Sequence, residues 1–133
     1  MSQQVKVYRE LDLQNLAKIT GRQVISKTGD YAVSVNDSGK LIIANKAGTA
    51  VAFTLPAVAS SKGRTYYFAV LGSGGMTING PAGTNVIVGK NNAAANTVAF
   101  TTASEMIGAA CRFWGDGTYY YFMQLSDCTA TLA

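Results

Sequence analysis

The side chains that most often catalyse reactions or hold metal ions are sparse in this sequence. Among the 133 residues there is no histidine, which removes the usual general base and the commonest metal ligand of proteins. The seven carboxylates are dispersed along the chain, as Glu10, Asp12, Asp30, Asp37, Glu105, Asp116 and Asp127. Two of them would have to meet in the fold to hydrolyse a glycosidic bond, and no further signature supports that chemistry. We therefore expect no catalytic residues and predict that the protein is not an enzyme.

Three other patterns resemble ligand sites. Cys111 and Cys128 are the only cysteines, and two thiols without a histidine cannot supply the four ligands of a structural zinc site. Cys111 lies in an apolar run and is expected to be buried, while a disulfide with Cys128 is left open. Gly115-Asp116-Gly117 lacks the spaced oxygen ligands of a calcium loop and is typical of a hairpin turn. The glycine-rich run 72–75 lacks the Lys-Ser/Thr that follows a phosphate-binding loop. We expect neither a metal ion nor a cofactor.

Aromatic side chains are concentrated in residues 66–68 and 119–122, where they would project from both faces of a strand. One face must belong to the core, and the other is free to form a subunit interface, a sugar platform or a base-stacking platform. A base-stacking platform also needs a basic groove, for which only Lys62, Arg64 and Arg112 lie near in sequence. We favour core plus a subunit interface. The interface candidates are Tyr66, Phe68, Trp114, Tyr119 and Tyr121.

The scaffold that positions these side chains is predicted from the spacing of apolar runs and turns. Between residues 31 and 56, three short apolar runs are separated by Asn-Asp-Ser-Gly and Asn-Lys-Ala-Gly-Thr. Strands of about five residues joined by such turns indicate an all-β sandwich or barrel. The expected strands cover residues 31–35, 40–44, 50–55, 65–71, 76–79, 85–88, 97–101, 105–114 and 118–125. We predict a compact antiparallel β-sandwich or barrel of about eight short strands. Residues 89–96 are too small and polar to pack a core and are expected to form a surface loop.

The chain divides into an N-terminal arm, residues 1–28, and a β-domain, residues 29–133. Residues 3–9 are expected to be extended, whereas residues 11–20 fit either a short helix capped by Asp12 or a strand. Ordering about twenty residues costs on the order of 30 kcal/mol, and burying every apolar side chain of the arm returns roughly 10–20 kcal/mol. The arm is therefore expected to be mobile unless a partner supplies backbone pairing. The alternative is a first strand packed on its own domain.

Composition favours a subunit whose surface is covered by neighbours. Hydrophobic residues make up 48% of the chain and charged residues 14%, against roughly 25% charged in an average soluble domain. The net charge is +4, but the basic residues are scattered singly, which argues against nucleic acid as a partner. No run reaches the 18 or more apolar residues of a membrane span, and residues 1–12 lack the apolar region of a signal peptide. We expect no membrane partner and assembly in a cytoplasm.

Two segments carry a resemblance to a known family. They are SVNDSGKLIIANKAGTAVAFTLP, residues 34–56, and FWGDGTYYYFMQL, residues 113–125, with an arm before them and a glycine-rich stretch between. In this pattern the chain resembles the small β-rich head decoration (cement) proteins and related head-fibre modules of tailed bacteriophages. In that family an Asp-Ser-Gly turn leads into an apolar strand, a Thr-Leu-Pro step closes the unit, and a late aromatic hairpin completes the domain. The resemblance covers about residues 31 to 125.

The resemblance implies a non-enzymatic virion protein. It would bind the outer surface of a phage capsid, stabilise contacts between major capsid proteins and form a homotrimer, after assembly in the host cytoplasm. Its partners would be the major capsid protein and other copies of itself. The arm argument supplies the capsid-binding candidates, which are Tyr8, Arg9, Leu11, Leu13, Leu16 and Arg22. The alternative is a carbohydrate- or receptor-binding module of a phage fibre, with the hairpin around residues 114–119 as its site.

Overall fold

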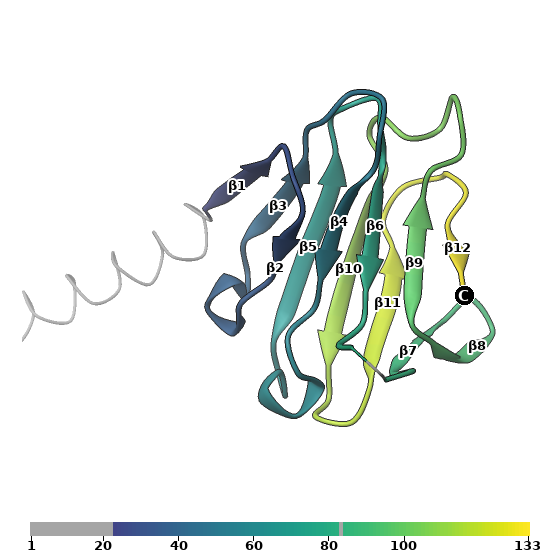
Figure 1. Ribbon diagram of the computed structural model, residues 1–133. Coiled ribbons are helices and arrows are strands. Elements are labelled where there is room, and N and C mark those ends of the chain that lie inside the picture. Colours follow the sequence, from purple (N-terminus) through teal and green to yellow (C-terminus); the bar gives the residue numbers. More distant parts are fainter. Residues whose placement is uncertain (1–22, 83) are drawn as a thin grey trace, which may run out of the picture.

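Two β-sheets face each other in the computed structural model, which describes residues 23–82 and 84–133 (Figure 1). Sheet A contains, in spatial order, β1 (Val24–Lys27), β3 (Leu41–Ala44), β5 (Thr65–Val70), β10 (Ala110–Gly115), β11 (Tyr120–Gln124), β7 (Ile87–Gly89) and β8 (Asn92–Ala95). Sheet B contains β12 (Thr131–Leu132), β9 (Thr97–Phe100), β6 (Met76–Asn79), β4 (Val51–Thr54) and β2 (Tyr31–Ala32). Two 3₁₀ turns, η1 (Val35–Asp37) and η2 (Val58–Ser60), lie between strands. The predicted all-β fold is confirmed.

The sheets are mixed, so the antiparallel arrangement that the sequence predicted is wrong for the first half of the chain. From β1 to β6 the chain alternates between the two sheets, so each strand is followed by a strand of the opposite sheet. Neighbouring strands within one sheet are therefore two strands apart in sequence. Consequently β1, β3 and β5 pair in parallel, as do β2, β4 and β6. Antiparallel pairs appear later, at β5 with β10, β10 with β11, and β6 with β9. Turn residues mark where the chain changes direction, but they do not determine which strand it pairs with next.

The sheet begins earlier than the sequence predicted. Strand β1 lies within the expected arm, yet it pairs in parallel with β3 from Val24 opposite Leu41 to Lys27 opposite Ala44. The Lys27 ammonium also lies 4.2 Å from the centre of the Tyr31 ring, in the range of a cation–π contact. The boundary at residue 28 is therefore corrected, because residues 24–27 belong to sheet A. Residues 1–22 lie outside the described residues.

Residues 89–96 form a hairpin and not the loop that the sequence predicted. Gly89 pairs with Asn92, and the two residues between them, Lys90 and Asn91, have φ of 45° and 63°. Two consecutive left-handed residues make the tight turn whose twist suits a hairpin. The segment needs few large side chains because β8 is an edge strand, and of its four residues only Ala95 is buried. The small, polar composition of the segment did not predict β8. The turn was also hard to predict, because a lysine rarely takes the left-handed conformation.

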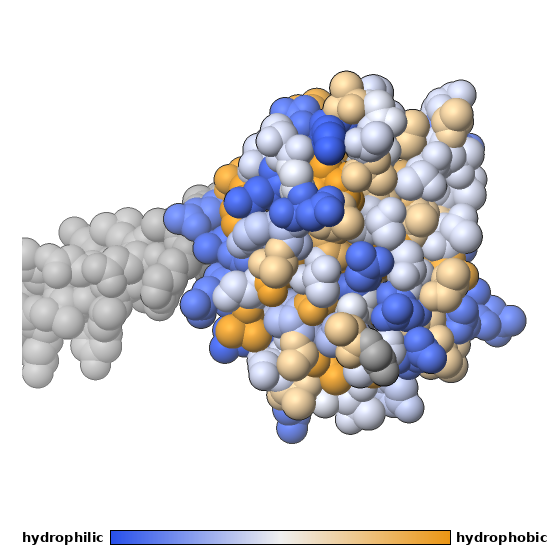
Figure 2. Space-filling view, in the orientation of Figure 1, coloured by the Kyte–Doolittle hydropathy of each residue, from blue (hydrophilic) through white to orange (hydrophobic). Residues whose placement is uncertain are grey.

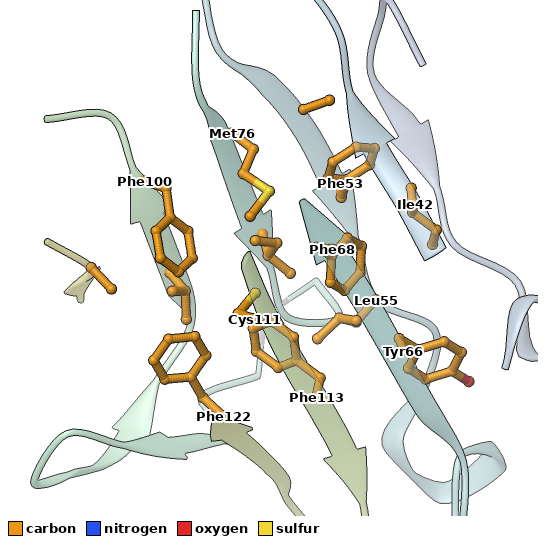
Figure 3. Packing of buried hydrophobic residues seen from close by; sticks show 14 of the residues in the cluster. Ile42, Phe53, Leu55, Tyr66, Phe68, Met76, Phe100, Cys111, Phe113 and Phe122 are labelled. Atoms are coloured by element: carbon orange, nitrogen blue, oxygen red, sulfur yellow. The ribbon is translucent and has the colours of Figure 1, made fainter. Parts of the chain in front are cut away.

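The core fills the space between the two sheets. Phe68 from β5 lies 5.2 Å from Phe53 of sheet B and 5.7 Å from Phe113 of β10, measured between ring centres. Phe113 in turn lies 5.5 Å from Phe122 (Figure 3). Such ring pairs contribute about 0.5–1.5 kcal/mol each beyond the burial of their area. Cys111 is fully buried among them, as expected, and it and Cys128 are free thiols.

Glycines allow two turns at one end of the sandwich to stack. The amide of Gly74, between β5 and β6, donates to the carbonyl of Lys46, between β3 and β4, over 2.8 Å. A Cβ atom at Gly74 would lie 2.0 Å from the carbonyl oxygen of Thr49, which is impossible without backbone movement. The turn predicted at residues 72–75 is confirmed, and its glycines serve this close backbone approach.

The surface is mixed in character. On the side of the molecule drawn in Figure 2, apolar patches alternate with hydrophilic side chains. This agrees with a chain in which only 14% of the residues are charged. Contacts made by this protein are therefore expected to depend on apolar and aromatic side chains more than on long-range electrostatic attraction.

Candidate functional site

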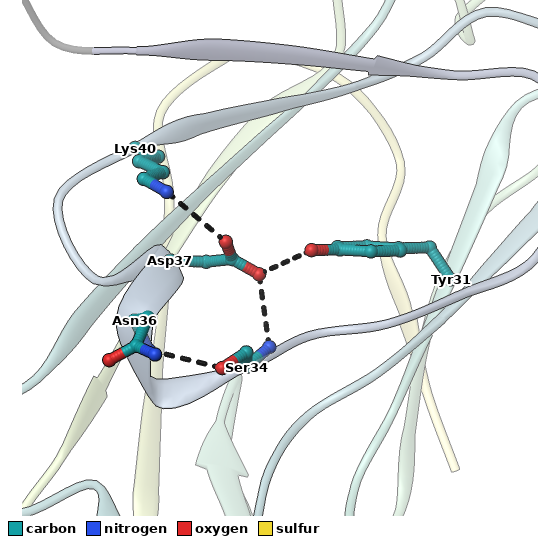
Figure 4. A network of polar contacts seen from close by, with 5 residues as sticks. All are labelled: Tyr31, Ser34, Asn36, Asp37 and Lys40. Carbon is teal, nitrogen blue, oxygen red and sulfur yellow. Dashed lines mark hydrogen bonds and ion pairs between the residues drawn. The ribbon is translucent and has the colours of Figure 1, made fainter.

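Asp37 is a buried carboxylate, and its contacts identify it as a structural residue. Its Oδ2 accepts hydrogen bonds from the Tyr31 hydroxyl at 2.6 Å and the Ser34 amide at 3.0 Å, while Lys40 Nζ lies 3.5 Å from Oδ1 (Figure 4). The Ser34 hydroxyl accepts from the Asn36 amide, completing a capping box around η1. Burial raises the pKa of Asp37, but the hydrogen bonds from Tyr31 and Ser34 and the charge of Lys40 outweigh it and leave the pKa lowered.

The residues of sheet A that alternate with the core residues form its outer face. Along β10, Cys111 and Phe113 point into the core, so Arg112 and Trp114 point outward. The same alternation holds along β3, β5 and β11, and in β7 Val88 follows the buried Ile87. We define the outer face by eight residues on five neighbouring strands, namely Leu41, Ile43, Tyr67, Val88, Arg112, Trp114, Tyr121 and Met123.

Strand register arranges these side chains in rows across the sheet. One row runs from Leu41 through Tyr67 and Arg112 to Met123, since each is paired with the next. The second row joins Trp114 to Tyr121 and Tyr121 to Val88. Side chains paired in this way on one face lie close enough to touch. The outer face is therefore continuous from β3 to β7.

Aromatic side chains at the β10–β11 end of the outer face are strongly exposed. Trp114 is 50% exposed, Met123 43% and Tyr121 37%, and the Trp114 and Tyr121 ring centres are 6.2 Å apart. These three side chains and Val88 line a shallow depression of about 600 Å³. Exposed apolar patches of this kind mark binding surfaces on soluble domains.

Asp116 closes one end of this depression. Its Oδ1 accepts hydrogen bonds from the amides of Thr118 and Tyr119, each at 2.7 Å, and its Oδ2 accepts from the Tyr121 hydroxyl at 2.8 Å. These bonds, first among them the one from the Tyr119 amide, lower the pKa of Asp116. Gly117 takes the left-handed conformation, with φ of 93°. The hairpin turn predicted for residues 115–117 is confirmed, and the carboxylate keeps its negative charge.

Arg112 is the cation of the outer face, and it lies between Tyr67 and Met123 in its row. Its guanidinium is 2.6 Å from Met123 Sδ, a weak acceptor, and its buried Nε has no hydrogen-bond partner. Within the described part of the chain no carboxylate forms an ion pair with it. An arginine fixed among apolar groups with unused donors is suited to an acceptor on another molecule.

The predicted interface residues separate into two groups. Tyr66 and Phe68 are fully buried, so their assignment to a subunit interface is wrong. Figure 3 shows both rings directed into the core, where the Tyr66 hydroxyl lies 2.9 Å from Ser61 Oγ. Trp114 and Tyr121 lie together on the outer face, and Tyr119 is 40% exposed in the adjoining turn.

Sequence reasoning missed most of the outer face. Its missed members are Leu41, Ile43, Tyr67, Val88, Arg112 and Met123, none of which was a site candidate. The signal was present as alternation, because each stands next to a buried residue in a short apolar run. The capsid-binding candidates Tyr8, Arg9, Leu11, Leu13, Leu16 and Arg22 all lie outside the described residues.

Neither a metal-binding cluster nor a membrane-spanning helix is present in the described part of the chain. Across residues 23–82 and 84–133, no cluster of three or more His, Cys, Asp or Glu side chains is placed to hold a metal ion. In the same residues, no helix has the length and apolar character needed to cross a membrane. The outer face therefore stands as the candidate functional site.

Comparisons with known proteins add no identification. No family model, no curated protein and no solved structure matches this chain. Its function must be inferred from the outer face, the composition and the sequence resemblance described above.

Proposed function

We propose that this chain is a non-enzymatic structural protein of a phage virion, which binds the outside of the capsid and stabilises contacts between major capsid proteins. The observation that carries the proposal is the outer face of sheet A, where Trp114, Tyr121 and Met123 are exposed on a rigid sheet. Large flat apolar surfaces bind other protein surfaces, because they offer area without a cavity for a small substrate. The sequence resemblance supplies the capsid as partner.

In this proposal the arm and the sheet have different roles. Tyr8, Arg9, Leu11, Leu13, Leu16 and Arg22 are the proposed capsid contacts, and Trp114, Tyr119 and Tyr121 are the proposed contacts between subunits. Linking several arms in one oligomer raises the effective concentration of each, so contacts that are weak singly hold firmly together. The homotrimer and the position on the outer capsid surface follow from the resemblance.

A carbohydrate- or receptor-binding module of a fibre is the second candidate. The depression beside Trp114 favours it, since aromatic rings with a neighbouring carboxylate are suited to bind sugars. However, both Asp116 oxygens already accept hydrogen bonds within the hairpin, and the remaining lining side chains, Val88, Trp114, Tyr121, Phe122 and Met123, are mostly apolar. A sugar would leave most of its hydroxyl groups unpaired there, so the protein-binding function is preferred.

Cosedimentation with undecorated capsids of the phage that encodes the chain tests the proposal. The intact protein is compared with a full-length variant carrying Leu11→Ser, Leu13→Ser and Leu16→Ser. Because these changes precede β1, which begins at Val24, they should leave both sheets folded. We expect the parent to pellet with capsids and the variant to remain in the supernatant.

Two other results would change the assignment. Equal pelleting of parent and variant would move the capsid contact from the arm to the β-domain. Failure of the parent to pellet, combined with binding to an array of bacterial surface glycans that Trp114→Ser abolishes, would replace the capsid proposal with the carbohydrate-binding one.

A further inference from the structure

Charges at the two ends of the exposed aromatic cluster have opposite signs. Arg112, Trp114 and Asp116 follow each other at alternate positions of β10 and its turn. Asp116 and Trp114 line the same depression, and Arg112 contacts Met123, which also lines it. With roughly 3.3 Å per residue along a strand, the Cα atoms of Arg112 and Asp116 lie about 7 Å on either side of the Trp114 Cα atom.

This arrangement is complementary to itself. A two-fold axis that lies between two facing copies, parallel to sheet A and perpendicular to β10 at Trp114, exchanges the two ends of the cluster. It would bring Arg112 of one copy opposite Asp116 of the other, and Asp116 of the first opposite Arg112 of the second. The aromatic rings of both copies would meet at the centre, and isologous contacts of this kind are the commonest basis of homodimers.

We propose that two copies of this chain pack through their outer faces about such an axis, with Trp114 and Tyr121 at the centre and an Arg112–Asp116 pair on each side. The inference does not depend on the capsid proposal, because it concerns association of the chain with itself. It competes with the homotrimer proposed above, because both assemblies place Trp114 and Tyr121 between subunits. A three-fold axis brings a face against a different face, whereas this charge pattern pairs the face with itself.

The charges of the single chain agree with this partner. No carboxylate in the described part of the chain forms an ion pair with Arg112, and the hairpin hydrogen bonds keep Asp116 ionised. An arginine–carboxylate pair gains strength when apolar side chains exclude water around it. Trp114 and Tyr121 are the residue types that most often dominate interface energies.

Sedimentation velocity of the intact chain over a wide range of concentrations tests the proposal. We expect a monomer–dimer equilibrium. Trp114→Ser removes the central ring, and Arg112→Glu places like charges opposite each other. Each should raise the dimer dissociation constant at least about tenfold, and added salt should partly restore the Arg112→Glu dimer.

The control is Ile107→Ser, which changes an apolar side chain that is even more exposed than Trp114. Ile107 is 66% exposed and precedes β10, at the end of that strand away from the aromatic hairpin. This variant should dimerise like the parent. Asp116→Asn tests the other charge and keeps an oxygen that can accept the turn hydrogen bonds of Thr118 and Tyr119. Circular dichroism of every variant shows whether it is folded. If Asp116→Asn is not folded, the salt series on Arg112→Glu still tests the charge pairing.

Three results would overturn the proposal. They are a monomer at all concentrations, a trimer, and a dimer that Trp114→Ser and Arg112→Glu leave as strong as in the Ile107→Ser control. A dimer would overturn the homotrimer contacts proposed for Trp114 and Tyr121, but capsid binding would still be decided by cosedimentation.

Discussion

Asp37 illustrates how one polar residue fixes the geometry of a turn. It joins β2, η1 and the approach to β3 through Tyr31, Ser34 and Lys40 (Figure 4). Because the hydrogen bonds to its carboxylate lower its pKa, its stabilising effect is present above the ordinary pKa of 3.8 and is lost as pH falls through the folded-state value.

Replacing this carboxylate should destabilise the domain. We expect Asp37→Ala to lower the free energy of unfolding by about 1–3 kcal/mol, because the Ser34 amide and the Tyr31 hydroxyl lose a charged acceptor. Urea denaturation at neutral pH measures the change. Asp127→Ala, at an exposed position, is the control and should be close to neutral. Equal stabilities of the two variants would show that the Asp37 network contributes nothing.

A second residue-scale prediction concerns the buried tyrosines. The Tyr120 hydroxyl lies 2.7 Å from Ser61 Oγ and donates to the Pro56 carbonyl at 2.5 Å. Burial raises the pKa of Tyr120 to about 12, from an ordinary value of 10.0. Between these values the folded state keeps a proton that the unfolded state loses, so stability should fall as pH rises from 10 towards 12.

The variant Tyr120→Phe separates this effect from general alkaline damage. Its stability at neutral pH should be lower by about 0.5–1.5 kcal/mol, through the lost hydrogen bonds. Its unfolding free energy should then decline less steeply than that of the parent across pH 10 to 12. Denaturant titrations at several pH values measure both slopes, and identical slopes would contradict the assignment.

At the scale of elements, two stacked turns hold the parallel strands β3 and β5 side by side. Between these strands the chain passes through β4 of the opposite sheet. The turn after β5 rests on the turn after β3, with the Gly72 and Gly74 amides bonded to the carbonyls of Ala44 and Lys46. This contact places the segment that leaves β5 directly against the segment that leaves β3. The glycine-rich stretch is therefore part of the scaffold that sets the register of sheet A.

Adding a methyl group there should be costly. Gly74→Ala would place a Cβ 2.0 Å from the Thr49 carbonyl oxygen, so the two turns must separate. We expect a loss of about 1–3 kcal/mol in the free energy of unfolding, measured by thermal or urea denaturation. Gly29→Ala is the matched control, since a Cβ at Gly29 would meet nothing within 4 Å. A Gly74→Ala protein as stable as Gly29→Ala would show that the turns are not closely stacked.

At the scale of the whole molecule, a small chain with few charges presents an apolar sheet face to its surroundings. The described residues form a continuous core between the two sheets, so burial of the outer face is not needed to build that core. Its exposed aromatics instead favour association, either with a second copy or with a shell of other proteins. The capsid and dimer experiments above address these two uses separately.

The sequence was sufficient to predict that the protein is built of strands and to locate most of them. The apolar runs at 65–71 and 76–79 coincide closely with β5 and β6, because alternating side chains and flanking turn residues are local properties. It also determined the hairpin at Asp116, whose Asp-Gly chemistry works within a few residues. Local interactions of this kind depend only on neighbours in the chain.

Tertiary structure decided which strands are neighbours and which side of each faces outward. Tyr66 and Tyr121 both lie in tyrosine-rich runs, yet one is fully buried and the other is 37% exposed. Period-two alternation defines two faces, but only the position of the opposite sheet decides which face is covered. The same holds for the parallel pairing of β1, β3 and β5, since that depends on contacts between distant residues. From the sequence, therefore, only Trp114 and Tyr121 of the outer face were predicted as site residues.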